Sequence, residues 1–315
     1  MAQRSVVENS VPLRPGALEE RLSTSLFLFL SPRLPPTRQP APRDDLAPFE
    51  AVAVPRRGRP GSLAATWFPA GRPRGAVLLL PPWLVWGRAY FLLRGRIQAL
   101  RAAGYHVLTL DFPGFGGGGP VDGLFDHDVA DGLELLRRRA EGLPLHVWGV
   151  SAGGTWAHLA LSRTRGVAGA MFEDVSPHLL EWSWRLFPAW RPGFLFFRAC
   201  FRSAYRYLDA RRHAGAMDLA AVTYVSGEQD RGVRPQDTRA LAKAAGGRCR
   251  IVPGAGHLGA IKVAGEEILS LALDTFRRAE EEPREDRDGP RLCEVESADC
   301  PSMGGRPHEA CPVRI

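Results

Sequence analysis

The sequence predicts an α/β protein with a mostly parallel central sheet that is covered by helices on both faces. Short apolar runs alternate with longer amphipathic segments between residues 76 and 279, as expected for strands joined by crossover helices. The chain has 315 residues, of which 45% are hydrophobic, so it can bury one large core. In sheets of this kind, ligand chemistry lies at the carboxyl ends of the strands.

The first predicted elements are two strands at residues 49–55 and 62–70. The turn-rich sequence PRRGRPG joins them, so we expect an antiparallel pair. Further strands are predicted at 76–80, 105–112, 145–150, 167–175, 219–228 and 248–254. Helical patterns cover 89–103, 126–141, a segment that starts at Ala152, 235–245 and about 259–279.

The chain divides into a compact middle and two extensions. Residues 1–48 are rich in Pro and Arg and are interpreted as an N-terminal arm. Residues 281–315 are charged and poor in core-forming side chains, so we expect a disordered C-terminal tail. The α/β domain is expected at 49–280. At about 178–218 the alternation stops, and a segment dense in Trp, Phe, Tyr and Arg is interpreted as a helical insertion between two strands.

The charge pattern does not indicate a nucleic-acid partner. The net charge is +7, but the basic residues are spread along the chain and form no known basic motif. We therefore expect the charges to lie mostly on the solvated surface. No run approaches the roughly 18 apolar residues of a membrane-spanning helix, and the apolar run at 25–30 is too short for a signal peptide. These observations predict a soluble, cytoplasmic protein.

The cysteines do not predict a metal site. The five cysteines form no C-x-x-C pair, and the spacing of Cys293, Cys300, His308 and Cys311 fits no common zinc site. A disordered tail is the preferred interpretation of that segment. The sequence also lacks H-E-x-x-H and P-loop motifs, so neither a metal nor another cofactor is implied.

The sequence LHVWGVSAGGTWAHLA contains the motif G-x-S-x-G at residues 149–153. The motif lies between a predicted strand and a predicted helix, which is the context of a nucleophile elbow. Small residues at 149 and 153 are expected to let the strand and the helix approach closely. The amides at the start of the helix then face an oxygen that gains negative charge on acylation. Ser151 is therefore the candidate nucleophile.

A serine nucleophile needs a base and an acid that orients the base. Asp230 follows one predicted strand, in VSGEQDRGV, and His257 follows the next, in VPGAGHLGA. Each residue alone also has an ordinary interpretation, Asp230 as a helix N-terminal acid and His257 as a polar loop residue. Because all three residues are expected at the ends of strands, the sequence predicts that Ser151, His257 and Asp230 act together.

The motifs GVSAGG, GEQD, GAGH and DFPGFG make the chain similar to members of the α/β-hydrolase superfamily over residues 50–280. The resemblance implies the α/β-hydrolase fold, with a mostly parallel sheet and a helical cap insertion. The chain order Ser151, Asp230, His257 is also the order of that family. The resemblance further implies a structural role for Asp111.

The resemblance leaves the identity of the acid open. Some relatives carry the catalytic acid at the end of the preceding strand, where this chain has Asp174. Asp230 is the preferred acid, because GEQD is the better positional match. Asp174 is the alternative, and Glu228 is a third candidate.

The loop after the third predicted strand departs from the family pattern. The family usually has His-Gly there, and the next residue donates a backbone N–H to the oxyanion hole; this chain has Pro81-Pro82. Proline has no N–H to donate. The resemblance then implies an oxyanion hole made by the amides of Trp83 and Ala152. The indoles of Trp83 and Trp86 either wall an acyl pocket or pack beneath the cap.

The insertion at 178–218 lies where relatives carry a cap over the active site. Its aromatic side chains indicate an apolar substrate group beneath it, or they form the core of the insertion itself. A third interpretation is an interfacial helix that contacts a membrane. Pro188 and Pro192 argue against membrane contact, since they would break a long amphipathic helix. The candidate pocket residues are Trp86, Trp182, Trp184 and Phe187.

The predicted function is hydrolysis of an ester or thioester of a lipophilic small molecule, in the manner of a carboxylesterase or lipase, through an acyl-enzyme on Ser151. The alternative is a catalytically silent scaffold that binds a hydrophobic ligand or a partner protein through its cap or arms. A peptidase, an acyltransferase and a carbon–carbon bond hydrolase also stay open, because all share this fold and these residue types.

Overall fold

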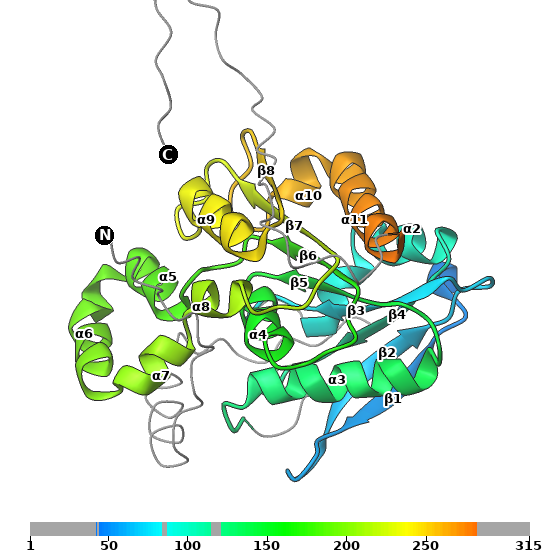
Figure 1. The fold of residues 1–315 in the computed structure, drawn as a ribbon, viewed down its shortest axis with the longest axis horizontal. Helices are drawn as coiled ribbons and strands as arrows, with labels where there is room; N and C mark the ends of the chain where they lie inside the picture. Colours follow the sequence, from blue (N-terminus) through cyan, green and yellow to red (C-terminus); the bar gives the residue numbers. More distant parts are fainter. Residues whose placement is uncertain (1–41, 43, 84–86, 115–120, 282–315) are drawn as a thin grey trace, which may run out of the picture.

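The computed structural model describes residues 42, 44–83, 87–114 and 121–281, which contain one eight-stranded sheet (Figure 1). The strand order is β1-β2-β4-β3-β5-β6-β7-β8. Strands β1 and β2 are antiparallel to each other, β2 is antiparallel to β4, and the others are parallel. The strand bounds are β1 Glu50–Pro55, β2 Ser62–Phe68, β3 Gly75–Leu80, β4 Tyr105–Leu110, β5 Leu145–Val150, β6 Gly169–Glu173, β7 Ala221–Gly227 and β8 Arg248–Val252. The predicted fold class and opening hairpin are confirmed.

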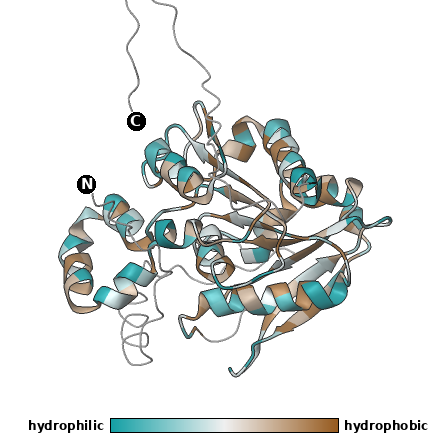
Figure 2. Cartoon of the chain, in the orientation of Figure 1, coloured by the Kyte–Doolittle hydropathy of each residue, from teal (hydrophilic) through white to brown (hydrophobic). Residues whose placement is uncertain are grey.

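Helices cover both faces of the sheet, and each face has its own apolar core (Figure 1). One layer contains α3 (Phe125–Arg139), α4 (Ala152–Leu161), α8 (Ala210–Ala214) and α9 (Pro235–Ala245). The other contains the 3-10 helix η2 (Gly87–Leu92), α2 (Arg96–Ala102), α10 (Ala260–Val263) and α11 (Gly265–Glu281). The parallel strands β3, β5, β6 and β7 are buried along their whole length. That burial explains why they appear as continuous apolar runs in the sequence. The outer side of α3 is hydrophilic (Figure 2).

The chain order reverses direction between two neighbouring strands, β3 and β5. From β3 the chain crosses to β4 on one side, and it then returns to β5 on the other side. In open α/β sheets such a reversal leaves room for a ligand at the carboxyl ends of the two strands. The loop after β3 and the Ser151 turn after β5 both lie at this point.

The helical insertion lies between β6 and β7 and extends beyond the edge of the two layers (Figure 1). It contains α5 (Leu179–Leu186), the 3-10 helix η3 (Pro188–Trp190), α6 (Arg191–Cys200), α7 (Arg202–Tyr207) and α8. In the described ranges, no helix is long and apolar enough to cross a membrane.

Two predicted helices are interrupted in the structure. The pattern at 89–103 is a 3-10 helix followed by α2, because Arg94 and Gly95 adopt left-handed backbone angles, with φ of 61° and 72°. The pattern at 259–279 is broken at Ala264, where φ is −132°. The packed chain also begins before residue 49, since Leu46 is fully buried in the core.

Three arginines are exceptions to the expectation that the charges lie mostly on the solvated surface. Arg56 is 4% exposed, and its Nε lies 3.0 Å from Asp128. Arg59, with a side chain only 8% exposed, lies 2.6 Å from the same carboxylate. Burial raises the pKa of Asp128 to about 6, although both arginines act to lower it. Arg96 is 1% exposed and contacts both carboxylate oxygens of Glu173 at 3.0 Å. Each buried cation is therefore paired, as its desolvation requires.

Candidate active site

Ser151 lies in a tight turn between β5 and α4. Its φ is 50° and its ψ is −120°, a conformation that residues other than glycine rarely adopt. The backbone N–H of Ser151 donates to the carbonyl of Glu173 at 2.8 Å, which ties the turn to the end of β6. The residue is 9% exposed. This hydrogen bond helps to hold the strained turn in place.

Small residues permit this turn, but not all in the way that the sequence suggests. A Cβ at Gly149 would lie 2.7 Å from the Cα of Gly154, so this glycine allows β5 and α4 to approach. A Cβ at Gly153 would lie 2.5 Å from the carbonyl oxygens of Leu80 and Pro81. Gly153 therefore brings α4 close to the end of β3 rather than to β5. That contact places the loop after β3 beside the first turn of α4.

The structure brings the three predicted residues together. Ser151 Oγ lies 3.1 Å from His257 Nε2, and His257 Nδ1 lies 2.6 Å from Asp230 Oδ2. Since a carboxylate oxygen accepts, Nδ1 carries the proton and the lone pair of Nε2 faces the serine hydroxyl. The other oxygen of Asp230 accepts from the amides of Gly232 and Val233 at 2.8 and 2.9 Å.

The surroundings of His257 favour its protonated form. Burial lowers the pKa of His257, but the hydrogen bond to Asp230 and the charges of Asp230 and Asp174 outweigh burial and raise the pKa above its ordinary 6.5. A histidine of this kind is a stronger proton acceptor than a free imidazole. The imidazolium that forms when it takes a proton is stabilised by the same carboxylates.

Asp174, the alternative acid, bonds to the backbone around the site. Its Oδ1 accepts from the amide of Gly227 at 3.1 Å, and its Oδ2 accepts from the amide of Leu258 at 2.7 Å. Burial, assisted by the charges of Asp230 and Glu173, raises its pKa to about 7 against the opposing effects of His257 and the Leu258 amide. Asp174 thus anchors the residue after His257, while Asp230 contacts the imidazole itself.

The other acids singled out in the sequence lie elsewhere. Glu228 is exposed, and its carboxylate accepts from the amide of Gly254 at 3.2 Å. Asp111 is fully buried and accepts from the amide of Arg88 at 2.8 Å, which fixes the start of η2. This contact agrees with the structural role that the family resemblance implies for Asp111.

The two predicted oxyanion-hole residues lie on either side of the contact between β3 and α4. Ala152 is the first residue of α4 and is 3% exposed. Trp83 follows the proline pair, and its ring packs edge-on against Phe125, with ring centroids 5.1 Å apart. Phe125 in turn stacks on Trp156 at 4.9 Å. The indole of Trp83 therefore packs against the aromatic core at α3 and α4. Trp86 lies outside the described residues.

Of the remaining candidate pocket residues, Trp182 contacts a candidate catalytic residue, His257. Its ring centroid is 5.7 Å from that of His257, and a Cβ at Gly232 would lie 2.4 Å from its Nε1. Trp184 packs partly against the core, with the Arg191 guanidinium 5.9 Å from its ring. Phe187 is half-buried at the end of α5. Trp182 therefore brings the insertion into contact with the candidate base.

A metal ion has a possible ligand set at the same place. Ligand atoms of Asp174, Asp230 and His257 lie within 4.8 Å of one another. These atoms, however, are already engaged in the hydrogen bonds described above, including the 2.6 Å contact of His257 with Asp230. The arrangement is that of an acid–base group rather than a cation cage. The segment with Cys293, Cys300, His308 and Cys311 lies outside the described residues.

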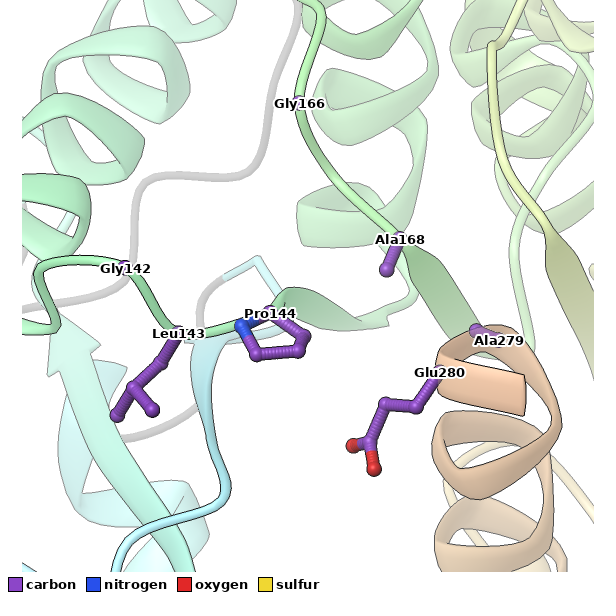
Figure 3. Close-up of a pocket in the computed structure, with 7 residues that line it drawn as sticks. All are labelled: Gly142, Leu143, Pro144, Gly166, Ala168, Ala279 and Glu280. Carbon is purple, nitrogen blue, oxygen red and sulfur yellow. The ribbon is translucent and has the colours of Figure 1, made fainter. Parts of the chain in front are cut away.

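A cavity of about 430 Å³ lies at the amino ends of the strands, opposite the end where Ser151 lies (Figure 3). It is lined by the loops that precede β5 and β6 and by the end of α11. The Glu280 side chain extends into it from α11, on the side opposite Leu143 (Figure 3). Because these loops lie at the amino ends of the strands, the cavity is separate from the Ser151 site.

The sequence interpretation missed Glu173, which lies directly before Asp174. Its side chain accepts from Arg96 and, at 2.7 Å, from the indole N–H of Trp148, while its carbonyl holds Ser151. The available signal was a pair of acids at the end of the otherwise apolar run VAGAMFEDV. Acids in such a run need buried partners.

Comparison with protein families identifies the class of this protein. The model of the Alpha/beta hydrolase family matches residues 77–267. The chain therefore belongs to the alpha/beta hydrolase family. Among curated proteins, no sequence matches significantly.

Several solved structures share the fold. An esterase of Pyrococcus furiosus superposes with a TM-score of 0.64 at 18% identity, over 78% of this chain and 95% of the esterase. A thermostable carboxyl esterase of Bacillus coagulans gives 0.57 at 15%, over 72% and 99%. A puromycin-hydrolysing peptidase of Mycobacterium tuberculosis gives 0.55 at 19%, over 73% and 39%. At these identities the likeness shows the fold alone. Membership of the alpha/beta hydrolase family supports hydrolase activity.

Proposed function

We propose that this protein is a serine hydrolase that cleaves esters or thioesters of lipophilic small molecules. The observation that carries the proposal is the continuous contact from Ser151 Oγ through His257 to Asp230, with distances of 3.1 and 2.6 Å. The serine lies in a strained turn at the reversal in strand order, the place where open α/β sheets hold their ligands.

In the proposed reaction, His257 Nε2 takes the proton of Ser151 Oγ as this oxygen attacks the substrate carbonyl. The tetrahedral intermediate collapses, the bond to the leaving alcohol or thiol breaks, and His257 gives the proton to the leaving group. Water then attacks the acyl-enzyme with His257 as the base, which releases the acid and restores Ser151. Asp230 keeps the proton on Nδ1 and stabilises the imidazolium throughout.

The oxyanion hole is assigned to the amides of Trp83 and Ala152. Ala152 opens α4, so the positive end of the helix dipole favours negative charge there. The close contact between Gly153 and the carbonyls of Leu80 and Pro81 supports a position of Trp83 near the same turn. Since Pro81 and Pro82 have no N–H, Trp83 is the first residue after β3 that can donate.

The lipophilic substrate class is supported by the insertion. Trp182 lies beside His257, so an aromatic surface borders the proposed catalytic residues. The Pyrococcus and Bacillus neighbours are esterases, whereas the Mycobacterium neighbour is a peptidase. An ester or thioester is preferred to a peptide because an alcohol or thiol is a better leaving group than an amine.

The test is hydrolysis of a series of p-nitrophenyl esters, from short to long acyl chains, by the wild type and by Ser151→Ala. We expect Ser151→Ala to lower kcat by about 10⁶-fold, and the preferred chain length to report the size of the pocket. Ser226→Ala is the matched control, because it removes another buried serine hydroxyl, one that accepts from Thr238 at 2.9 Å. If no ester is turned over and a fluorophosphonate probe does not label Ser151, the protein is a binding scaffold instead.

A further inference from the structure

Helix α6 carries an apolar stripe on its outer side. Pro192, Leu195, Phe196 and Ala199 are all exposed, with Leu195 at 50% and Phe196 at 58%. Their spacing of three, four and seven residues places them on one face of the helix. We call these four residues the α6 stripe. α6 lies at the outer edge of the molecule, far from the sheet (Figure 1), and its ribbon includes hydrophobic segments (Figure 2).

The stripe is not needed to fold the insertion. The inward side of α6 already buries Phe194 and Phe197, which are 2% and 0% exposed. A helix that is apolar on its inner side and again on its outer side has a second surface to cover. Exposed Leu and Phe at helical spacing, next to one another, differ from the scattered apolar residues of ordinary surfaces.

Positive charge surrounds the stripe. Arg191, Arg198, Arg202 and Arg206 are exposed on α6 and α7. Residues 182–208 contain no Asp or Glu, so no acid of this segment neutralises them. Apolar side chains flanked by arginines match a lipid surface with anionic head groups, where the stripe enters the acyl boundary and the guanidinium groups meet phosphates.

The two prolines that argue against an interfacial helix in the sequence do not interrupt it in the structure. Pro188 is the first residue of η3 and Pro192 is the second residue of α6. At the start of a helix the missing N–H of proline has no intrahelical partner to lose. The chain thus changes direction between α5 and α6, and the stripe remains continuous.

We propose that the α6 stripe and its arginines form a docking surface for anionic lipid membranes. A second copy of this chain fits less well, because symmetric contact would place arginines against arginines. The acidic segment at 281–288 matches the arginines in charge, but it offers no large apolar side chain to cover Leu195 and Phe196. The proposal does not depend on catalysis, since it concerns a surface distant from Ser151.

The test is co-sedimentation of the full chain, as Ser151→Ala, with vesicles of phosphatidylglycerol and phosphatidylcholine in equal parts and with vesicles of phosphatidylcholine alone. We expect binding to the anionic vesicles that weakens as salt is added. Changing Leu195 and Phe196 together to Gln should weaken that binding by at least about tenfold. Changing Arg191 and Arg198 together to Gln should weaken it by about tenfold.

Val263→Gln is the matched control, because Val263 is 58% exposed, like Phe196, but lies on α10. It should bind vesicles as well as the parent. Circular dichroism and the thermal midpoint establish that each variant is folded. Absence of binding to anionic vesicles, or equal binding by the Leu195/Phe196 variant and the control, overturns the proposal. Self-association of the parent that the same double change abolishes also overturns it, in favour of a second copy as the partner.

Discussion

One histidine–carboxylate pair lies at the carboxyl ends of the strands and another at the amino ends. The two pairs differ in exposure, in pKa and in hydrogen bonding. At the carboxyl ends of the strands, His257 lies 2.6 Å from Asp230. At the amino ends, His146 lies 3.1 Å from Glu280. The side chain of His257 is 26% exposed, whereas that of His146 is fully buried. Both carboxylates receive further hydrogen bonds.

The two pairs also differ in what the second ring nitrogen of each histidine contacts. Nε2 of His257 faces the hydroxyl of Ser151, while Nδ1 of His146 is buried without a hydrogen-bond partner among the described residues. Burial lowers the pKa of His146 more than Glu280 raises it. For His257 the carboxylates prevail and the pKa is raised. A histidine beside a carboxylate is therefore a candidate base only when its other nitrogen meets a reacting group.

The cavity at the amino ends of the strands illustrates the same point. Glu280 lines it (Figure 3). Its carboxylate accepts from Tyr105 at 2.8 Å and from Arg74 at 2.6 Å. Together with the contact to His146, these hydrogen bonds tie the end of α11 to β4, to the start of β3 and to β5. The pair at the amino ends is thus a structural junction, while the pair at the carboxyl ends is the proposed catalytic group.

The largest expected difference comes from removing each histidine. His257→Gln should lower kcat for ester hydrolysis by about 10⁶-fold, since base and nucleophile act as a unit. His146→Gln should leave kcat within about twofold of the wild type and reduce the free energy of unfolding by about 1–3 kcal/mol, because a buried contact with Glu280 is lost. Ester kinetics and urea unfolding of both variants measure the two effects. A large loss of kcat in His146→Gln would show that His146 is not merely structural and would contradict the distinction between the two histidines.

The carboxylates provide the next largest contrast. Asp230→Asn should lower kcat by about 10⁴-fold, because the amide no longer holds the proton on Nδ1. Glu280→Gln should leave kcat nearly unchanged. Asp174→Asn tests the alternative acid, and we expect a much smaller loss than for Asp230→Asn, since Asp174 contacts backbone amides rather than the imidazole. If Asp174→Asn were the more damaging change, the assignment of the acid would move to Asp174.

The pH dependence of kcat/KM should show the raised pKa of His257. The base must be neutral, so kcat/KM should increase with pH to a plateau, with a midpoint above 6.5. The charge of Asp174 contributes to the raised pKa, so Asp174→Asn should move the midpoint to lower pH. Glu280→Gln is the control, because Glu280 contacts His146 instead, and it should leave the midpoint in place. An unchanged midpoint in Asp174→Asn would show that Asp174 does not act on His257.

The smallest effect concerns stability in acid. Folding lowers the pKa of His146, so neutral His146 is favoured in the folded protein. Its contribution to the free energy of unfolding is fully present above about pH 6.5, the pKa of an unfolded histidine, and is lost as the pH falls through the folded pKa. Between about pH 7 and pH 5, the wild type should lose about 1 kcal/mol more unfolding free energy than His146→Gln. Thermal or urea unfolding at both pH values measures the difference. Parallel pH curves would mean that His146 is protonated alike in both states.

The alternation of strands and helices could be read from the sequence because it depends on local periodicity and on burial. The buried strands β3, β5, β6 and β7 are continuous apolar runs, and α9 was found at its observed bounds, with Pro235 at its start and Gly246 at its end. The G-x-S-x-G motif likewise located the Ser151 turn, since only a few residue types tolerate such a backbone.

Interruptions inside helices were harder to predict. Arg94 adopts a left-handed conformation although arginine has no local preference for it, so the break before α2 depends on packing. The burial of Arg56, Arg59 and Arg96 also could not be predicted from the sequence, because each is paired with a carboxylate from a distant segment. A local pattern does not contain those partners.

The sequence by itself determined the fold class and the residue types of the candidate site, because both follow from hydrophobic periodicity and short motifs. Only the tertiary structure decided which acid touches His257, since Asp174 and Asp230 both follow the ends of neighbouring strands and differ by the paths of their loops. The structure also decided that the α6 stripe faces outward. Helical spacing defines a face, but the packing of Phe194 and Phe197 determines which face meets solvent.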